Sequence, residues 1–175
     1  GKPFLIMQRI NGRPLGDVLR EDVPRQPELL SRFVQLVVDL HHLNPALFLQ
    51  METFSNQPPD DPSAWLPALL SRWRGIVAAH AWAAPIFDWL DAHAPEVASG
   101  TTHLSPLHGD FHPHNVLITP DDQLYVIDWS GFSLGDYRYD LAWTLLLIAS
   151  SGYPQLRELI LSEYARLAGQ PVTNI

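Results

Sequence analysis

Four polar residues near the middle of the chain could do chemistry together. His108, Asp110 and Asn115 lie close in sequence, and Asp128 follows after two apolar segments that flank turn residues at 120–122. This pattern predicts a β-hairpin, which would bring two carboxylates and an amide to one place. Such a set suits phosphoryl transfer, in which one carboxylate orients the attacking hydroxyl while an amide oxygen and a second carboxylate hold Mg²⁺ against phosphates.

The same residues resemble the motifs of a known family. His108, Gly109, Asp110, four further residues and Asn115 match the H-G-D-x-x-x-x-N loop of aminoglycoside phosphotransferases and choline kinases, and IDW at 127–129 resembles their metal-binding segment. The segments GDYRYDLA at 135–142, LHHLN at 40–44 and INGRPL at 10–15 are also similar to the family, so the resemblance extends from about residue 4 to residue 167. It implies an α+β, predominantly helical fold. This is the C-terminal lobe of a protein-kinase-like fold, in which a small β-hairpin carries the catalytic and metal-binding residues.

The resemblance implies a role for each polar residue. Asp110 would be the catalytic base, with His108 supporting it in the catalytic loop. Asn115 and Asp128 would bind Mg²⁺, and Asp140 would brace the loop from a helix. His114 departs from the family, which usually has glycine at that position.

The resemblance also implies a nucleotide and an acceptor. The backbone of Met7, Gln8 and Arg9 is similar to the hinge that binds the base of ATP or GTP. The acceptor would be a hydroxyl group of a small, aminoglycoside-like or choline-like molecule, selected by a helical region at about 51–102. Some acidic residues could attract such a cation or could simply be solvated: Asp60, Asp61, Asp88, Asp91 and Glu96.

The nucleotide-covering lobe of such a kinase is not recognisable in the sequence. Lys2 is the only lysine, and no G-x-G-x-x-G pattern occurs. We therefore expect a hinge-like strand within 1–10, a C-terminal lobe over 11–175 with its catalytic loop and hairpin at 107–129, and no N-terminal nucleotide lobe. The chain alone should transfer phosphate slowly or not at all, and the unpaired strand at 4–7 could mediate self-association.

Two alternatives remain open from the sequence. The chain could be a non-catalytic kinase-like binding module or a truncated fragment. It could instead be a zinc-dependent hydrolase, because His108, His112 and His114 with Asp110 are good zinc ligands at a plausible spacing.

Composition narrows the partners. The chain has 175 residues and a formal net charge of -8, which disfavours a nucleic-acid partner because binding to phosphates needs a basic surface. It has no cysteine, which excludes disulfides and is compatible with a cytoplasmic location. Its longest strongly apolar run, at 141–149, is about half of the roughly 20 residues that span a bilayer, so we expect no membrane partner.

Several elements must position the polar residues. Apolar spacing predicts helices at 27–43, 64–80, 85–93, 139–150 and 155–168, the last ended by Gly169, with hairpin strands at 116–119 and 124–127 and a loop at 51–65. A strand is expected at 4–7. The tryptophans at 65, 73, 82 and 89 could line a substrate pocket, although their helical spacing favours core packing.

Overall fold

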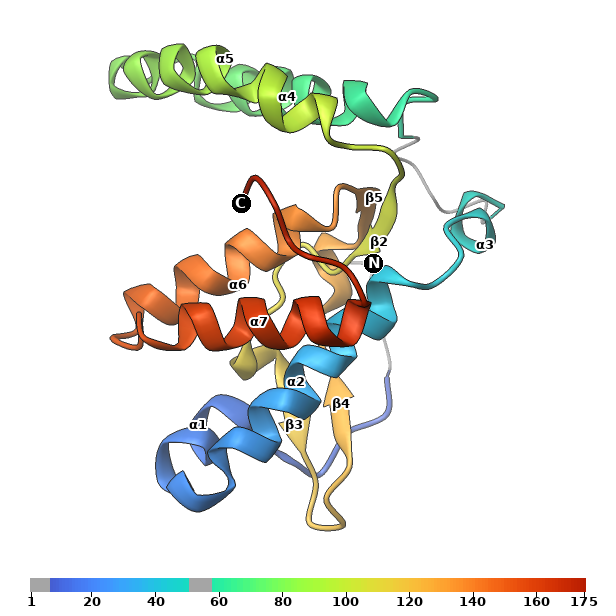
Figure 1. Cartoon of the computed structure of the whole chain (residues 1–175), viewed down its shortest axis with the longest axis vertical. Helices are drawn as coiled ribbons and strands as arrows, with labels where there is room; N and C mark the ends of the chain where they lie inside the picture. Colours follow the sequence, from blue (N-terminus) through green and yellow to red (C-terminus); the bar gives the residue numbers. More distant parts are fainter. Residues whose placement is uncertain (1–6, 51–57) are drawn as a thin grey trace, which may run out of the picture.

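The computed structural model describes residues 7–50 and 58–175 and shows a mainly helical molecule with two small antiparallel sheets (Figure 1). The predicted α+β fold is confirmed. In chain order the helices are α1 (Leu15–Glu21), α2 (Gln26–His41), α3 (Ala46–Leu49), α4 (Trp65–Val77), α5 (Ala84–Ser99), α6 (Arg138–Ser150) and α7 (Leu156–Ala168). Short 3₁₀ turns lie at Val23–Arg25, Pro62–Ala64, Ala81–Ala83, Pro113–Asn115 and Trp129–Gly131.

The two sheets frame the polar motif. Strands β1 (Arg13–Pro14), β3 (Val116–Ile118) and β4 (Leu124–Val126) form one sheet in the order β1-β3-β4, with β3 and β4 as the predicted hairpin. Strands β2 (Ser105–Leu107) and β5 (Ser133–Gly135) form the other. Because β2 ends directly before His108 and β5 follows Asp128 by a few residues, this second pair joins the two polar segments.

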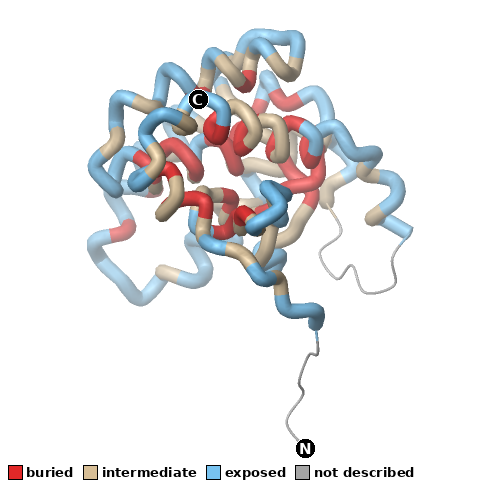
Figure 2. The backbone as a smooth tube through the Cα atoms, turned by 90° about the horizontal axis from the view of Figure 1, so that it is seen from below, coloured by how far each residue is buried: buried red, intermediate tan, exposed pale blue. Residues whose placement is uncertain are grey.

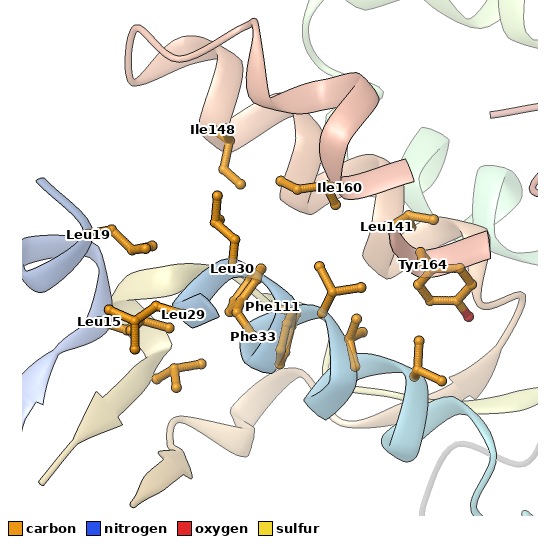
Figure 3. Close-up of a cluster of buried hydrophobic side chains, with 14 of the residues drawn as sticks. Leu15, Leu19, Leu29, Leu30, Phe33, Phe111, Leu141, Ile148, Ile160 and Tyr164 are labelled. Atoms are coloured by element: carbon orange, nitrogen blue, oxygen red, sulfur yellow. The ribbon is translucent and has the colours of Figure 1, made fainter. Parts of the chain in front are cut away.

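The hydrophobic core surrounds α2, which packs against α6, α7 and the catalytic loop (Figure 3). Phe33 of α2 and Phe111 of the loop are fully buried and stack with their ring centroids 4.7 Å apart. The tube view shows the buried residues gathered in the middle of the molecule (Figure 2). The catalytic loop is therefore anchored in the core by a side chain of its own.

Helices α4 and α5 form a separate layer, set apart from the core helices in Figure 1. None of the α4 residues is buried, and only Phe87 and Ala98 are buried in α5. A cluster of polar side chains ties the end of α5 to the start of α6. There Arg138 donates from Nη2 to the Val97 carbonyl at 2.9 Å, and the Thr101 hydroxyl donates to Asp136 at 2.6 Å.

Most predicted elements are present within a few residues of their expected bounds. The structure continues α5 to Ser99, beyond the predicted end at residue 93 and through Pro95, and contacts with Arg138 hold its last turn. Gly169 ends α7 in the left-handed conformation, as predicted. The expected strand at 4–7, and with it the proposed self-association edge, lies outside the described residues except for Met7, which is not in a strand.

The expected core role of the tryptophans is wrong for three of the four. Trp73, Trp82 and Trp89 are exposed, because the α4–α5 pair has too few neighbours to cover them, and only Trp65 is half-buried. No helix in the described ranges is long and apolar enough to cross a membrane.

Candidate active site

The catalytic loop starts where β2 ends, and a buried carboxylate holds its backbone. Asp140, in the first turn of α6, is fully buried. It accepts hydrogen bonds from the backbone N–H groups of His108 at 2.7 Å and Gly109 at 2.8 Å. One turn further along α6, the Thr144 hydroxyl donates to the Phe111 carbonyl at 2.6 Å. Helix α6 thus fixes the first part of the loop, from His108 to Phe111, through buried and partly buried hydrogen bonds.

Gly109 is required by two independent features of this loop. Its φ of +82° lies in the region that favours glycine. A Cβ at this position would also lie 2.4 Å from the Gly131 carbonyl oxygen, so the loop backbone crosses the backbone that follows Asp128 in direct contact. This crossing explains why glycine stands between His108 and Asp110.

His108 joins the loop to the end of the hairpin. Its ring is fully buried, with Nε2 lying 2.9 Å from the Ile127 carbonyl and Nδ1 accepting the Asp110 backbone N–H at 3.3 Å. These partners select the neutral tautomer with hydrogen on Nε2. Both ring nitrogens are therefore used inside the protein, and His108 cannot act as a zinc ligand in this arrangement.

The Asp110 carboxylate is oriented by two donors and remains accessible. The Trp143 indole of α6 donates to Oδ1 at 2.6 Å, and Asn115 Nδ2 donates to Oδ2 at 3.2 Å. The side chain is 41% exposed, so a substrate hydroxyl can reach it. His112 Nε2 lies 3.5 Å from Oδ2. Burial lowers the pKa of His112, an effect that the nearby Asp110 charge partly offsets.

Asn115 links the two carboxylates. Besides its side-chain contact with Asp110, its backbone carbonyl accepts the Ile127 N–H at 2.9 Å, directly before Asp128. Asp128 itself has a left-handed backbone with φ of +61°, and its Oδ1 accepts the Ser130 hydroxyl at 2.8 Å. The sequence pattern predicts these residues in one site. In the structure, hydrogen bonds of Asn115 connect Asp110 with the segment that leads into Asp128.

The donor set fits a magnesium ion better than zinc. Asn115 Oδ1 and Asp128 Oδ2 accept no hydrogen bond from the described residues, so two hard oxygen donors are available. The described part of the chain has no cluster of three His, Asp or Glu side chains that could hold a metal alone. Mg²⁺ is usually held by one or two carboxylates together with phosphates and water.

Comparison with known proteins identifies the family of the chain. The family model described as the phosphotransferase enzyme family matches residues 1–173. The chain belongs to this family. No curated protein matches the chain significantly.

Solved structures show the same fold as this phosphotransferase-family chain. A candidate aminoglycoside phosphotransferase from Ralstonia eutropha has a TM-score of 0.68 at 16% identity, with 96% of this chain and 56% of that chain covered. An aminoglycoside phosphotransferase from Streptomyces rimosus, solved with ADP and streptomycin, has a TM-score of 0.59 at 15% identity, with 93% and 62% covered. The choline kinase LicA from Streptococcus pneumoniae has a TM-score of 0.55 at 19% identity, with 94% and 51% covered. The chain thus spans between half and two thirds of the length of these structures.

A pocket of about 610 Å³ opens beside the catalytic loop of this phosphotransferase-family fold. Gly109, Ser130 and Gly131 form its floor, and α4 forms a wall. Trp65 fixes that wall, because its ring lies directly over the Gly135 backbone and meets Tyr139 edge-on at 5.8 Å. The lining of the pocket thus includes the residue before Asp110 and a residue two positions after Asp128, although neither carboxylate is itself a lining residue.

His114, the departure from the family pattern, turns away from Asp110. Its ring packs against Gly16 of α1, where a Cβ would lie 2.8 Å from the imidazole. Gly16 therefore makes room for the larger side chain. Both residues border a second cavity of about 210 Å³ on the α1 side of the loop.

The hinge-like residues are described, but the structure does not join them to the site. Met7, Gln8 and Arg9 are exposed and have no regular secondary structure. Within the described residues, none of their side chains forms a hydrogen bond with the catalytic loop. Their role in binding a nucleotide stays a prediction.

The sequence interpretation missed Trp143 and Gly131 as members of the site. Trp143 lies one turn after Asp140, so both side chains point from the same side of α6 toward the loop. That spacing was a usable signal. Gly131 could not be recognised, because its importance comes from a backbone crossing between distant segments.

Proposed function

We propose that this chain is the catalytic and acceptor-binding lobe of a small-molecule kinase. It would transfer the γ-phosphoryl group of ATP or GTP to a hydroxyl group of a small acceptor. Membership of the phosphotransferase family supports the reaction class. The observation that carries the proposal is the link through Asn115, which touches the Asp110 carboxylate with its side chain and the residue before Asp128 with its backbone.

Each residue has a defined task in the proposed reaction. Asp110 accepts or orients the hydrogen of the acceptor hydroxyl, while Trp143 and Asn115 keep its carboxylate in place. Asn115 Oδ1 and Asp128 would hold Mg²⁺, which when bound neutralises the charge of the phosphate groups. His108 and Asp140 act through the loop backbone and do not touch substrate in this scheme.

The proposal includes a nucleotide-covering lobe outside this chain. In this scheme Asp110, Asn115 and Asp128 supply the groups that bind the metal and activate the acceptor. Solved structures of the same fold are considerably longer than this chain. Met7, Gln8 and Arg9 would then contact the nucleotide base. We also propose a cytoplasmic location, with which the cysteine-free sequence is compatible.

Calorimetric titration of Mg²⁺-ATP tests the site. We expect Asp128→Ala to abolish or strongly weaken binding by the full-length gene product, because it removes a metal-binding carboxylate. Asp121→Ala is the matched control, since Asp121 is an exposed carboxylate in the turn of the same hairpin. Equal binding by the wild-type protein and the Asp128→Ala variant would contradict the proposed metal site. An absence of Mg²⁺-nucleotide binding in the wild-type gene product would favour the non-catalytic module.

A further inference from the structure

We propose that the acceptor is a hydroxyl compound with an apolar body and an anionic group, and that Arg72 binds the anion. This inference rests on the proposed function, because it names the substrate class for the same site. It differs from the cationic acceptor that the family resemblance implies. The reasons lie in the walls of the 610 Å³ pocket.

The pocket walls are mainly apolar and aromatic. Its lining includes Trp65, Leu69, Trp73, Ile76, Phe132 and Tyr139. Two of these, Trp73 and Ile76, are more than 40% exposed. Exposed tryptophan and isoleucine on a pocket wall favour burial of an apolar ligand surface over a strongly hydrated one. The acceptor should therefore carry a ring or an aliphatic body.

The charge on the described lining is positive. Arg72 is its charged side chain, and no carboxylate of the described residues lines the pocket. None of the acidic residues that could have attracted a cation is a lining residue. Of these, Asp91 pairs with Arg74 at 2.6 Å, and Asp61 accepts hydrogen bonds from Ser63. A cation on the tryptophan faces would gain a cation–π contact but would be repelled by the guanidinium.

Arg72 also differs from most of the other arginines of the chain. Apart from Arg9 and Arg72, every arginine forms an ion pair with a carboxylate. Arg74, two residues further along α4, is held by Asp91 and lies over the Phe87 ring at 4.9 Å. Among the described residues, Arg72 has neither an ion pair nor a hydrogen bond. Its planar guanidinium is therefore available on the pocket wall for a carboxylate or similar anion.

Three matched probes separate the contribution of charge from that of shape. 3-Phenyllactate, 3-phenyllactamide and phenylalaninol each carry a hydroxyl group and a phenyl ring, and they are anionic, neutral and cationic. Their binding to the full-length gene product can be followed by calorimetry and by the fluorescence of the pocket tryptophans. We expect 3-phenyllactate to bind most tightly and phenylalaninol least tightly.

Variants on α4 assign the preference to one side chain. Arg72→Gln should weaken binding of 3-phenyllactate by about tenfold or more, the size of a charge-assisted hydrogen bond, and should leave 3-phenyllactamide unchanged. Arg74→Gln is the matched control on the same helix and should leave the order of the probes intact. Circular dichroism of each variant verifies the fold.

Several results would overturn the inference. Tightest binding of phenylalaninol would show a cationic acceptor. Equal binding of the three probes, or no effect of Arg72→Gln, would remove the role of Arg72, and no binding of any probe would exclude the apolar anionic class. None of these outcomes affects the binding of Mg²⁺-ATP or its sensitivity to Asp128→Ala, so a failure here is distinguishable from a failure of the proposed function.

Discussion

The catalytic loop and the α4–α5 helix pair are held in opposite ways. The loop is fixed by buried groups: Phe111 stacks in the core, Asp140 accepts two backbone hydrogen bonds, and Gly109 lies against Gly131. Helix α4 has no buried residue and packs chiefly against α5. Its main anchor to the core is the half-buried Trp65.

This difference separates two tasks. Groups that touch the reacting atoms need a fixed geometry, which the core supplies. Groups that select an acceptor can vary on a loosely attached layer without disturbing the reaction. In this molecule the pocket lies between the two regions, so one wall is rigid and the other is adaptable.

Removal of the Asp140 carboxylate should have the largest effect. Asp140→Ala leaves the buried N–H group of His108 and the partly buried N–H group of Gly109 without an acceptor, and we expect a loss of about 3 kcal/mol or more in the free energy of unfolding. Denaturant unfolding followed by circular dichroism measures this loss. Asp39→Ala, at an exposed carboxylate of α2, is the control and should change stability little. A loss below about 0.5 kcal/mol for Asp140→Ala would contradict the bracing role.

The polar cluster that ties the end of α5 to the start of α6 should make the stability of the fold depend on pH. Burial raises the pKa of Asp136, but hydrogen bonds from Arg138 and Thr101 outweigh this effect and lower it below the ordinary value of 3.8. A carboxyl whose pKa is lowered in the folded state stabilises the fold above its unfolded pKa and loses this contribution as the pH falls through the folded value. Stability should therefore decline below about pH 4.

Asp136→Asn tests this dependence. It leaves the buried Arg138 without its charged partner, so we expect a loss of about 2 kcal/mol at pH 7. The variant should lose less stability than the wild-type protein on acidification from pH 5 to pH 3, as measured by urea unfolding at each pH. Identical acid dependence in the two proteins would count against the contribution of Asp136.

A glycine-to-alanine substitution should change the free energy of unfolding in opposite directions in the two regions. Gly109→Ala forces an alanine into positive φ and against the Gly131 carbonyl, so we expect a loss of about 1–2 kcal/mol. Gly75→Ala in α4 meets no atom within 4 Å, and alanine is the better helix former, so we expect a gain of about 0.5–1 kcal/mol. Thermal unfolding of both variants measures the contrast. Destabilisation by both substitutions to the same extent would mean that the two regions are equally constrained.

The sequence predicts the long helices and the β3–β4 hairpin well, because their apolar periodicity and turn residues are local signals. It does not predict α1, which lacks a side-chain cap, or the β2–β5 pair, in which β2 contains Pro106 and exists through its partner strand. The polar members of the candidate site were selected from motif spacing. Trp143 could have been found from its helical spacing after Asp140, whereas Gly131 and the Arg72 wall depend on contacts between distant segments that one sequence does not show. The exposed tryptophans show the same limit, since helical spacing cannot tell a core face from an exposed one.

Hydrolysis of Mg²⁺-ATP by the full-length gene product, with water in place of the acceptor, tests the central claim most directly. The wild-type protein should hydrolyse ATP slowly. Asp110→Asn should lower this rate by about 100-fold or more while keeping Mg²⁺-ATP affinity, because it removes the base but no metal ligand. An unchanged rate for Asp110→Asn would contradict the assignment of Asp110 as the residue that activates the acceptor.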